Sequence, residues 1–279
     1  MSPVVPLAVA TLLSLHGLRS GSLSPSGAAT AFLVGFTVFA APVRAFGVSL
    51  IVFYLVGSRA TKYGKQRKAR LEDGYLAAGY RSGWQVLSNA LVVLTASVAW
   101  GVTFAPHVVP FSFLHRIYPV SQQSVPYDDA NAQLACSLGD TLASELGILS
   151  SLPPILITTL KPVPPGTNGG VSLGGTLASL SGGLIMGLTM FLTLARENAA
   201  CRSEWNEILL PLLGWGTLAG GLGSLLDSFL GATVQCTRYS RGRKLIMQDG
   251  YAPSSSAELE VISGVDLLTN NQVGFAWLI

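Results

Sequence analysis

The sequence predicts an all-α fold, a polytopic membrane bundle of about seven or eight apolar segments. Of its 279 residues, 49% are hydrophobic and only 11% are charged, whereas a soluble domain carries about 25% charged residues. The mean hydropathy is +0.50. Apolar stretches recur from one end to the other without a soluble block between them. We therefore expect a single integral membrane domain over residues 1–279.

The first apolar stretch is MSPVVPLAVATLLSLHGLRSG, and it is predicted to be a membrane span. A signal peptide is the alternative, but Arg19 follows the apolar run instead of preceding it. The chain then continues through further apolar stretches near 27–41, 43–57, 84–105, 131–150, 169–194 and 208–235, and a last one from about 270. Pro42 alone separates the second and third stretches, so we expect a tight hairpin there or a re-entrant pair.

Lys and Arg gather in a few of the connecting loops. The loop 58–82 holds seven of them, and the loop 236–269 holds four more. The positive-inside rule places both loops in the cytoplasm, and counting spans adds 19–26 and 151–168. A nucleic-acid patch is the alternative for the basic loop. Because spans flank it, we expect membrane lipid headgroups as its partner and no nucleic acid.

Small residues recur at every fourth position in three of the stretches. One row contains Gly27, Ala31 and Gly35, and the other two run over residues 175–187 and 216–232. Rows of this kind allow helix backbones to approach closely in lipid. They predict a compact bundle that can keep polar side chains away from lipid.

Three acidic residues fall inside apolar stretches, where carboxylates are costly and usually functional. They are Asp140, Glu145 and Asp227, and all lie near predicted cytoplasmic ends. Converging on one divalent cation is one interpretation, since such ions take oxygen ligands. Capping of helix ends, or pairing with a nearby Lys or Arg, is the other.

Two further polar stretches lie on the same predicted side. Arg81, Gln85 and Asn89 are spaced four apart, so a helix would place them on one face, leading inward from the cytoplasmic edge. The stretch KPVPPGTNGGVSLGG (161–175) lacks the order of a Walker A loop. It nevertheless has the parts of a phosphate site, because Lys161 is a cation and its glycines permit the backbone turns that direct N–H groups at an anion. The donors expected there come from Gly166, Thr167, Asn168, Gly169 and Gly170.

Several stretches together resemble the transmembrane protein 19 family, a multi-pass family that includes a plant phytyl-phosphate kinase. They are SLSPSGAATAFLVG (22–35), RSGWQVLSNA (81–90), GDTLASELG (139–147), KPVPPGTNGGVSLGG (161–175), GSLLDSFLGA (223–232) and LLTNNQV (267–273). A looser similarity extends to the polyprenol, dolichol and phytol kinases. This sequence departs from the family at Ser24, where the family usually has an acidic residue.

The resemblance implies a membrane kinase that phosphorylates an isoprenoid acceptor, with CTP or ATP as the donor. In that reading Asp140, Glu145 and Asp227 hold Mg²⁺, and Lys161 with the 166–170 loop and Arg81 holds the triphosphate. The substrate cavity is lined by polar side chains of Gln85, Asn89, Asn270 and Asn271. The prenyl tail is expected between the helices that carry small-residue rows.

A non-catalytic membrane protein, such as a transporter or structural partner, is the rival hypothesis, because buried carboxylates also serve ion-coupled transport. Endoplasmic reticulum or another endomembrane is the expected location. The sequence contains no signal for the oligomeric state.

Overall fold

The computed structural model describes residues 3–71, 79–105, 107–111, 127–242, 244–247 and 259–268. These residues are mostly helical. The long helices are α1 (Val4–Arg19), α2 (Pro25–Ala40), α3 (Arg44–Lys62), α5 (Gly83–Phe104), α7 (Tyr127–Gly147), α8 (Leu173–Glu197) and α10 (Trp205–Val234). Two short helices, α4 (Lys65–Lys68) and α9 (Ala199–Ser203), connect them. The all-α membrane class predicted from the sequence is confirmed.

Three of the described helices, α5, α8 and α10, are long and apolar enough to cross a membrane. Helices α1 and α2 are apolar but shorter. The predicted stretches up to residue 235 therefore correspond to helices in order. The apolar stretch predicted from about 270 lies outside the described residues.

Five short strands were not predicted from the sequence. They are β1 (Ile155–Leu156), β2 (Gly170–Val171), β3 (Thr237–Ser240), β4 (Leu245–Met247) and β5 (Leu259–Ser263). Strands β1 and β2 form an antiparallel pair, and the other three form an antiparallel sheet in the order β4-β3-β5. Strand β1 and the three-stranded sheet fall in the loops 151–168 and 236–269, which are predicted to be cytoplasmic, and β2 lies just after the first of these loops.

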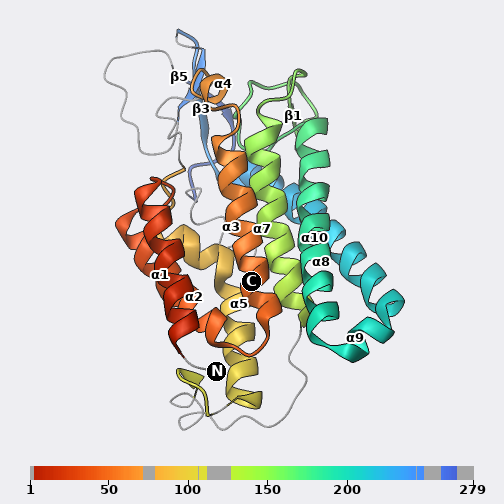
Figure 1. The fold of residues 1–279 in the computed structure, drawn as a ribbon. Coiled ribbons are helices and arrows are strands. Elements are labelled where there is room, and N and C mark those ends of the chain that lie inside the picture. Colours follow the sequence, from red (N-terminus) through yellow and green to blue (C-terminus); the bar gives the residue numbers. More distant parts are fainter. Residues whose placement is uncertain are drawn as a thin grey trace.

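These loops lie at one end of the bundle (Figure 1). The short helix α4, strand β1 and the sheet containing β3 and β5 sit together there, above the helices. The turn between α1 and α2 also belongs to this end, because Leu23 forms a backbone bridge with Arg81. We call it the loop end. That it faces the cytoplasm stays a prediction.

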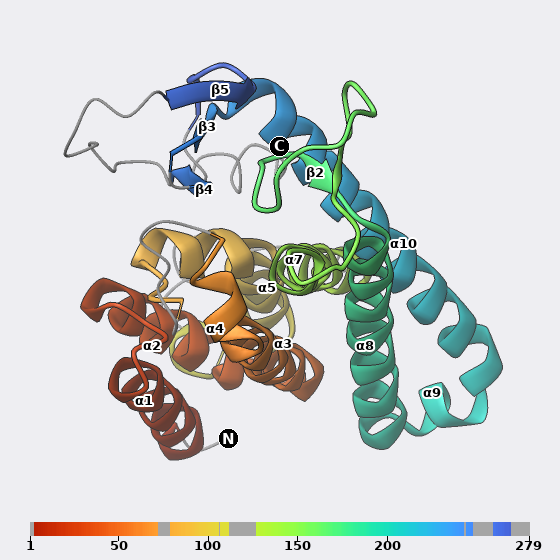
Figure 2. The ribbon, with the colours of Figure 1, turned by 90° about the horizontal axis from the view of Figure 1, so that it is seen from above.

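Helices α7, α8 and α10 lie side by side (Figure 2), and they pack through glycine and other small residues. A methyl group added at Gly220 would lie 2.7 Å from the Ser179 carbonyl oxygen, and one added at Gly182 would lie 2.9 Å from Gly139. The three backbones are thus in near contact, as the small-residue rows predicted. At these positions the backbones of α7, α8 and α10 leave no room for a prenyl tail between them, whereas Ala31 and Gly35 of the row on α2 line a cavity.

The closest approach of α8 to α10 provides a test of this packing. We expect Gly183→Leu to lower the free energy of unfolding by about 2–3 kcal/mol, because an added side chain would collide with the backbone of Gly216. Gly214 is the matched control on α10, since no atom lies within 4 Å of its added methyl position. Gly214→Leu should leave thermal unfolding in detergent unchanged. Equal unfolding temperatures for the two variants would contradict this packing.

The other helices complete the bundle around a common apolar core. Helix α2 packs against α1 and α5, and α3 lies against α7 and α8. Val38, Phe46, Val93, Leu134 and Met186 are fully buried where these helices meet. This arrangement holds α3, α5 and α7 side by side, and their ends at the loop end carry the polar side chains considered next.

Candidate functional site

Arg81 is held in place by the turn between α1 and α2. Its backbone N–H donates to the Ser22 carbonyl oxygen at 2.9 Å, and its own carbonyl accepts from Ser24 N–H at 3.0 Å. Gly27 is required beside it, because an added side-chain carbon would collide with the Arg81 carbonyl oxygen. Two stretches that are far apart in the sequence, 22–35 and 81–90, therefore form one structural unit.

Ser24 explains how this unit tolerates the departure from the family pattern. Its side-chain oxygen accepts from Gly27 N–H at 2.9 Å and so caps the first turn of α2. Serine and aspartate are both favoured at this helix position. A serine in place of the acidic residue therefore preserves the cap.

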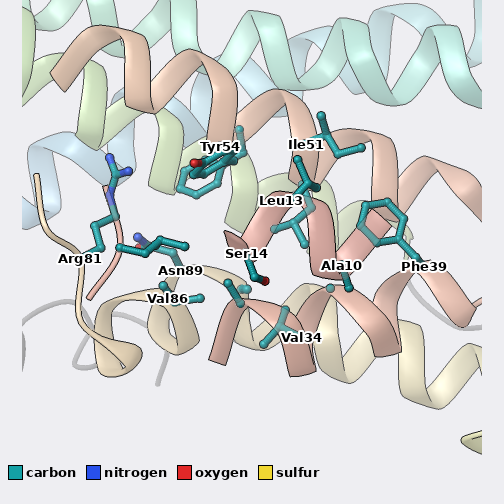
Figure 3. A pocket seen from close by; sticks show the side chains of 16 residues that line it. Ala10, Leu13, Ser14, Val34, Phe39, Ile51, Tyr54, Arg81, Val86 and Asn89 are labelled. Atoms are coloured by element: carbon teal, nitrogen blue, oxygen red, sulfur yellow. The ribbon is translucent and has the colours of Figure 1, made fainter. Parts of the chain in front are cut away.

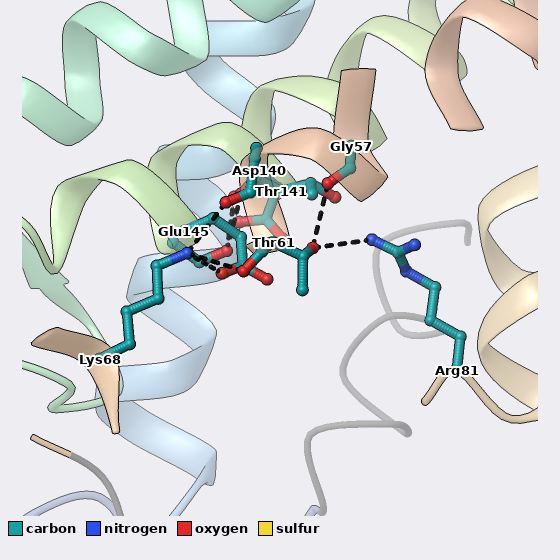
Figure 4. A network of polar contacts seen from close by, with 9 residues as sticks. Gly57, Thr61, Lys68, Arg81, Asp140, Thr141 and Glu145 are labelled. Carbon is teal, nitrogen blue, oxygen red and sulfur yellow. Dashed lines mark hydrogen bonds and ion pairs between the residues drawn. The ribbon is translucent and has the colours of Figure 1, made fainter. Parts of the chain in front are cut away.

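The Arg81 side chain extends from its position before α5 toward α3 (Figure 4). Its guanidinium lies 3.3 Å from the Thr61 hydroxyl and 3.5 Å from the Ser58 hydroxyl, and it forms no ion pair with any described residue. Burial lowers the pKa of Arg81, and the negative charge of Glu145 acts in the opposite direction. An arginine stays protonated in proteins. Among the described residues, its guanidinium hydrogen-bonds to the neutral hydroxyl groups of Ser58 and Thr61.

Lys68 is a second cation beside it, and in the sequence it is only one member of the basic loop 58–82. Its side chain is almost completely buried, and its ammonium donates to the Glu145 carboxylate at 2.6 Å. It also donates to the carbonyl oxygens of Ala60 and Thr61 at the end of α3. Glu145 therefore has a cationic partner inside the protein, as the alternative interpretation allowed.

The only local signal for Lys68 is the glycine before α4. Gly64 has a φ of 65°, a left-handed conformation that glycine adopts readily. This turn reverses the chain, so that Lys68 returns to the end of α3 while Lys65 and Arg67 stay exposed. In the sequence all three are alike, as members of one basic run.

Asp140 and Asp227 come together where α7 and α10 touch. One turn earlier in each helix, the Cys136 thiol lies against Gly223 and donates to the Ala219 carbonyl oxygen at 3.0 Å. The two carboxylates interact electrostatically across this contact, and neither forms an ion pair with a described residue. Two carboxylates side by side repel one another unless a proton or cation lies between them.

The expected set of three metal-binding carboxylates is therefore reduced to a pair. Glu145 is turned toward Lys68, and the described part of the chain contains no cluster of three His, Cys, Asp or Glu that could hold a metal ion. A pair still fits Mg²⁺, which typically binds one or two carboxylates and completes its shell with water and phosphate oxygens. Asp140 and Asp227 are the residues that would hold it.

The Gly-rich loop reaches α10 beside Asp227. Gly169 packs against the Ser228 carbonyl oxygen and Ala232, so that no side chain fits there. Gly166 and Gly169 have left-handed φ values of 88° and 80°. This conformation agrees with the prediction that these glycines form backbone turns. The structure thus brings together three of the stretches that carry the family resemblance: 139–147, 161–175 and 223–232.

The N–H groups of this loop are less available than the sequence suggested. Those of Thr167 and Gly170 donate to carbonyl oxygens within the loop, and that of Asn168 donates to the Thr237 hydroxyl of β3 at 3.2 Å. Lys161 is exposed on the segment between β1 and β2 and forms no ion pair with a described residue. The loop is placed beside the carboxylate pair, but it offers fewer free donors than a phosphate cradle needs.

The polar row 81–89 also differs from the expectation. Helix α5 begins at Gly83, so Arg81 precedes the helix instead of sharing its face. Gln85 accepts from Ser82 N–H at 2.9 Å in a capping box, which uses its side chain at the helix start. Asn89 does line a cavity. Asn270 and Asn271 lie outside the described residues.

That cavity lies between α1, α2, α3 and α5 (Figure 3). Arg81, Asn89 and Tyr54 lie at one end of it, and Ala10 and Phe39 lie at the other. Its lining is otherwise almost entirely apolar. Arg81 therefore belongs both to this cavity and, through Thr61, to the polar group formed by Lys68 and Glu145 (Figure 4).

The sequence of this chain is similar to those of several known proteins. "Protein PGR" of Arabidopsis thaliana is 35% identical over 276 residues, covering 96% of this chain and 89% of that protein. "Protein VTE6, chloroplastic" of the same plant is 27% identical, covering 84% of this chain and 64% of that protein. An uncharacterized membrane protein of Synechocystis, sll0875, is 28% identical over 76% of this chain and 72% of its own length.

No solved structure matches the chain. The family model described as "Integral membrane protein DUF92" matches residues 8–279, nearly the whole length. The chain therefore belongs to the DUF92 family of integral membrane proteins.

Proposed function

We propose that this protein is a membrane kinase that transfers a phosphoryl group from CTP or ATP to an isoprenoid acceptor. The observation that carries the proposal is the juxtaposition at the loop end of a carboxylate pair, Asp140 and Asp227, with the buried cations Arg81 and Lys68. Beside them the cavity lined by Arg81 leads between apolar helices. Phosphoryl transfer requires this kind of positioning and charge balance and little covalent chemistry from the protein.

Each of these residues would have a distinct role. Asp140 and Asp227 would hold Mg²⁺, which when bound neutralises charge on the transferring phosphates. Lys161 and the exposed part of the 161–170 segment would contact the nucleotide from outside the bundle. Lys68 keeps Glu145 neutralised, so that a third carboxylate does not add repulsion near the phosphates. The acceptor would enter from the membrane, where its apolar chain is soluble.

The resemblance to a family that contains a phytyl-phosphate kinase supports the isoprenoid part of the proposal. An endomembrane location is equally part of the proposal. Such a layout also accounts for the position of the Gly-rich segment, because the nucleotide is dissolved in water and its acceptor lies in the bilayer.

Acceptor-stimulated nucleotide consumption tests this function. Protein purified in lipid nanodiscs is supplied with Mg²⁺ and either CTP or ATP, and nucleoside diphosphate release is followed with phytyl, geranylgeranyl and farnesyl acceptors. We expect one nucleotide to be consumed only when an isoprenoid is present. If no nucleotide responds to any alcohol or monophosphate in this set, the kinase proposal fails and the transporter or structural-partner hypothesis takes its place.

A further inference from the structure

Gln133 is a buried amide on α7 that contacts the backbone of α5. Its side-chain oxygen accepts from the N–H groups of Val92 and Val93 at 3.2 and 3.3 Å, and its side-chain nitrogen donates to the Ser88 carbonyl oxygen at 2.9 Å. Only 6% of Gln133 is exposed. In a regular helix the Val92 N–H donates to the Ser88 carbonyl oxygen. One side chain of α7 therefore bridges both members of a backbone pair inside α5.

Helix α5 changes direction along its length. Its first turns run across the bundle, and its later turns run along it (Figure 1, Figure 2). A side chain that inserts into the ladder of backbone hydrogen bonds bends a helix in this way. The Ser88 hydroxyl favours the bend as well, because it donates to the Gln85 carbonyl oxygen at 3.1 Å within the same helix. Helix α5 contains no proline, so the contact with Gln133 accounts for the bend.

The segment of α5 before the bend follows Arg81. Asn89 belongs to this segment and lines the cavity together with Arg81. The start of the segment is fixed against α2, where the Gly83 N–H donates to the Ser26 hydroxyl at 3.3 Å. Its end is fixed by Gln133. The segment is thus held at two points, one on α2 and one on α7.

Helix α7 carries both this contact and two of the acidic residues. Asp140 lies about two turns after Gln133, and Glu145 lies further along the same helix. The position of Arg81 relative to these carboxylates therefore depends on where α7 holds α5.

We propose that Gln133 is a positioning residue that fixes Arg81 and Asn89 relative to the carboxylates of α7 by holding the bend of α5. The bend stands on the hydrogen bonds alone, and its effect on phosphoryl transfer rests on the proposed function. Without the Gln133 amide, the Ser88 carbonyl oxygen and the Val92 N–H would bond only to each other. Helix α5 would then straighten, and its start would move relative to the rest of the bundle.

The distance between the start of α5 and α8 measures this role without any catalysis. Spin labels are introduced through non-natural amino acids at the exposed Trp84 and Leu184, and the distance is measured by pulsed electron resonance in nanodiscs. We expect Gln133→Met to shift the mean distance by ~3 Å or more, about two residues of helical rise. Asn131→Leu is the matched control and should cause no shift, because this buried amide of α7 donates to the Leu212 carbonyl oxygen of α10. An unchanged distance in Gln133→Met, or an equal shift in both variants, would overturn the proposal.

Gln133→Glu provides the test if Gln133→Met does not fold. A protonated carboxyl group has the same pattern of acceptor and donor as the amide, whereas an ionised one cannot donate to the Ser88 carbonyl oxygen. The distance in Gln133→Glu should therefore match that of wild type in acidic buffer and shift in alkaline buffer. A distance in this variant that does not depend on pH would refute the role of Gln133.

Steady-state kinetics connect the bend to the proposed reaction. Gln133→Met should lower kcat for transfer to an isoprenoid acceptor by about tenfold to 100-fold, because small misplacements of reacting groups are costly. The KM for the nucleotide should stay the same, since the Gly-rich loop packs on α10. In acidic buffer Gln133→Glu should have the kcat of wild type. If wild type transfers no phosphoryl group but the distance responds to Gln133→Met, the proposed function fails and the bend stands. If wild type is active and Gln133→Met keeps its kcat, the positioning role fails alone.

Discussion

Asp140→Asn is expected to reduce phosphoryl transfer by about 100-fold or more. A bound metal contributes several kcal/mol of charge stabilisation in such reactions, and each ~1.4 kcal/mol corresponds to a factor of ten in rate. Replacing one of only two paired carboxylates removes half of the protein's negative charge at the proposed metal position. The measurement is the initial rate of transfer at saturating Mg²⁺ and nucleotide.

The control for this variant is Glu207→Gln. Glu207 is an exposed carboxylate in the first turn of α10, at the opposite end of that helix from Asp227, so its loss should leave the rate unchanged. Both variants should elute as monodisperse protein from size-exclusion chromatography in detergent. An Asp140→Asn protein that is folded and retains the wild-type rate would remove Asp140 from the site.

Lys68→Met is expected to lower the free energy of unfolding by about 3 kcal/mol. Removing one partner of a buried ion pair leaves the other charge without compensation, and here Glu145 would lose its contact of 2.6 Å with the ammonium. The apolar chain of methionine replaces the packing of the lysine stem, so the effect reports mainly the charge. Thermal unfolding of detergent-purified protein measures it.

Two further variants test the origin of this effect. Lys65→Met removes an exposed charge from the same short helix, so we expect no change in unfolding temperature. The double variant Lys68→Met/Glu145→Gln should recover much of the loss, because it removes the uncompensated carboxylate as well. If the double variant is no more stable than Lys68→Met alone, the ion pair is not the source of the stability.

The helices of the bundle could be predicted from the sequence because apolar stretches and small-residue rows are local patterns. Gly175 and Gly183 on α8 and Gly220 on α10 belong to rows of small residues spaced four apart, and all three lie in close contacts between helices. The short strands could not be predicted in this way. Strand β3 pairs with β5 across more than fifteen residues of intervening chain, and such pairing leaves little trace in either segment alone.

The candidate site was predictable only in part, because its residues meet through contacts between distant segments. Asp140 and Asp227 were identified because burying a carboxylate in an apolar helix costs free energy, and the structure places the two residues together. Lys68 was not, because a lysine in a basic run looks exposed until the turn at Gly64 returns it to α3. Gln85 was expected in a polar row, and the structure places its side-chain oxygen in a capping box, since both arrangements share the same spacing at a helix start.

The identity of the labelled product decides whether the protein is an isoprenoid kinase. Wild-type protein in nanodiscs is incubated with Mg²⁺, γ-labelled CTP or ATP, and geranylgeranyl monophosphate, and the lipids are separated by chromatography. We expect labelled geranylgeranyl diphosphate with the label in its terminal phosphate. Absence of label from every lipid, in protein that is folded and monodisperse, would contradict it.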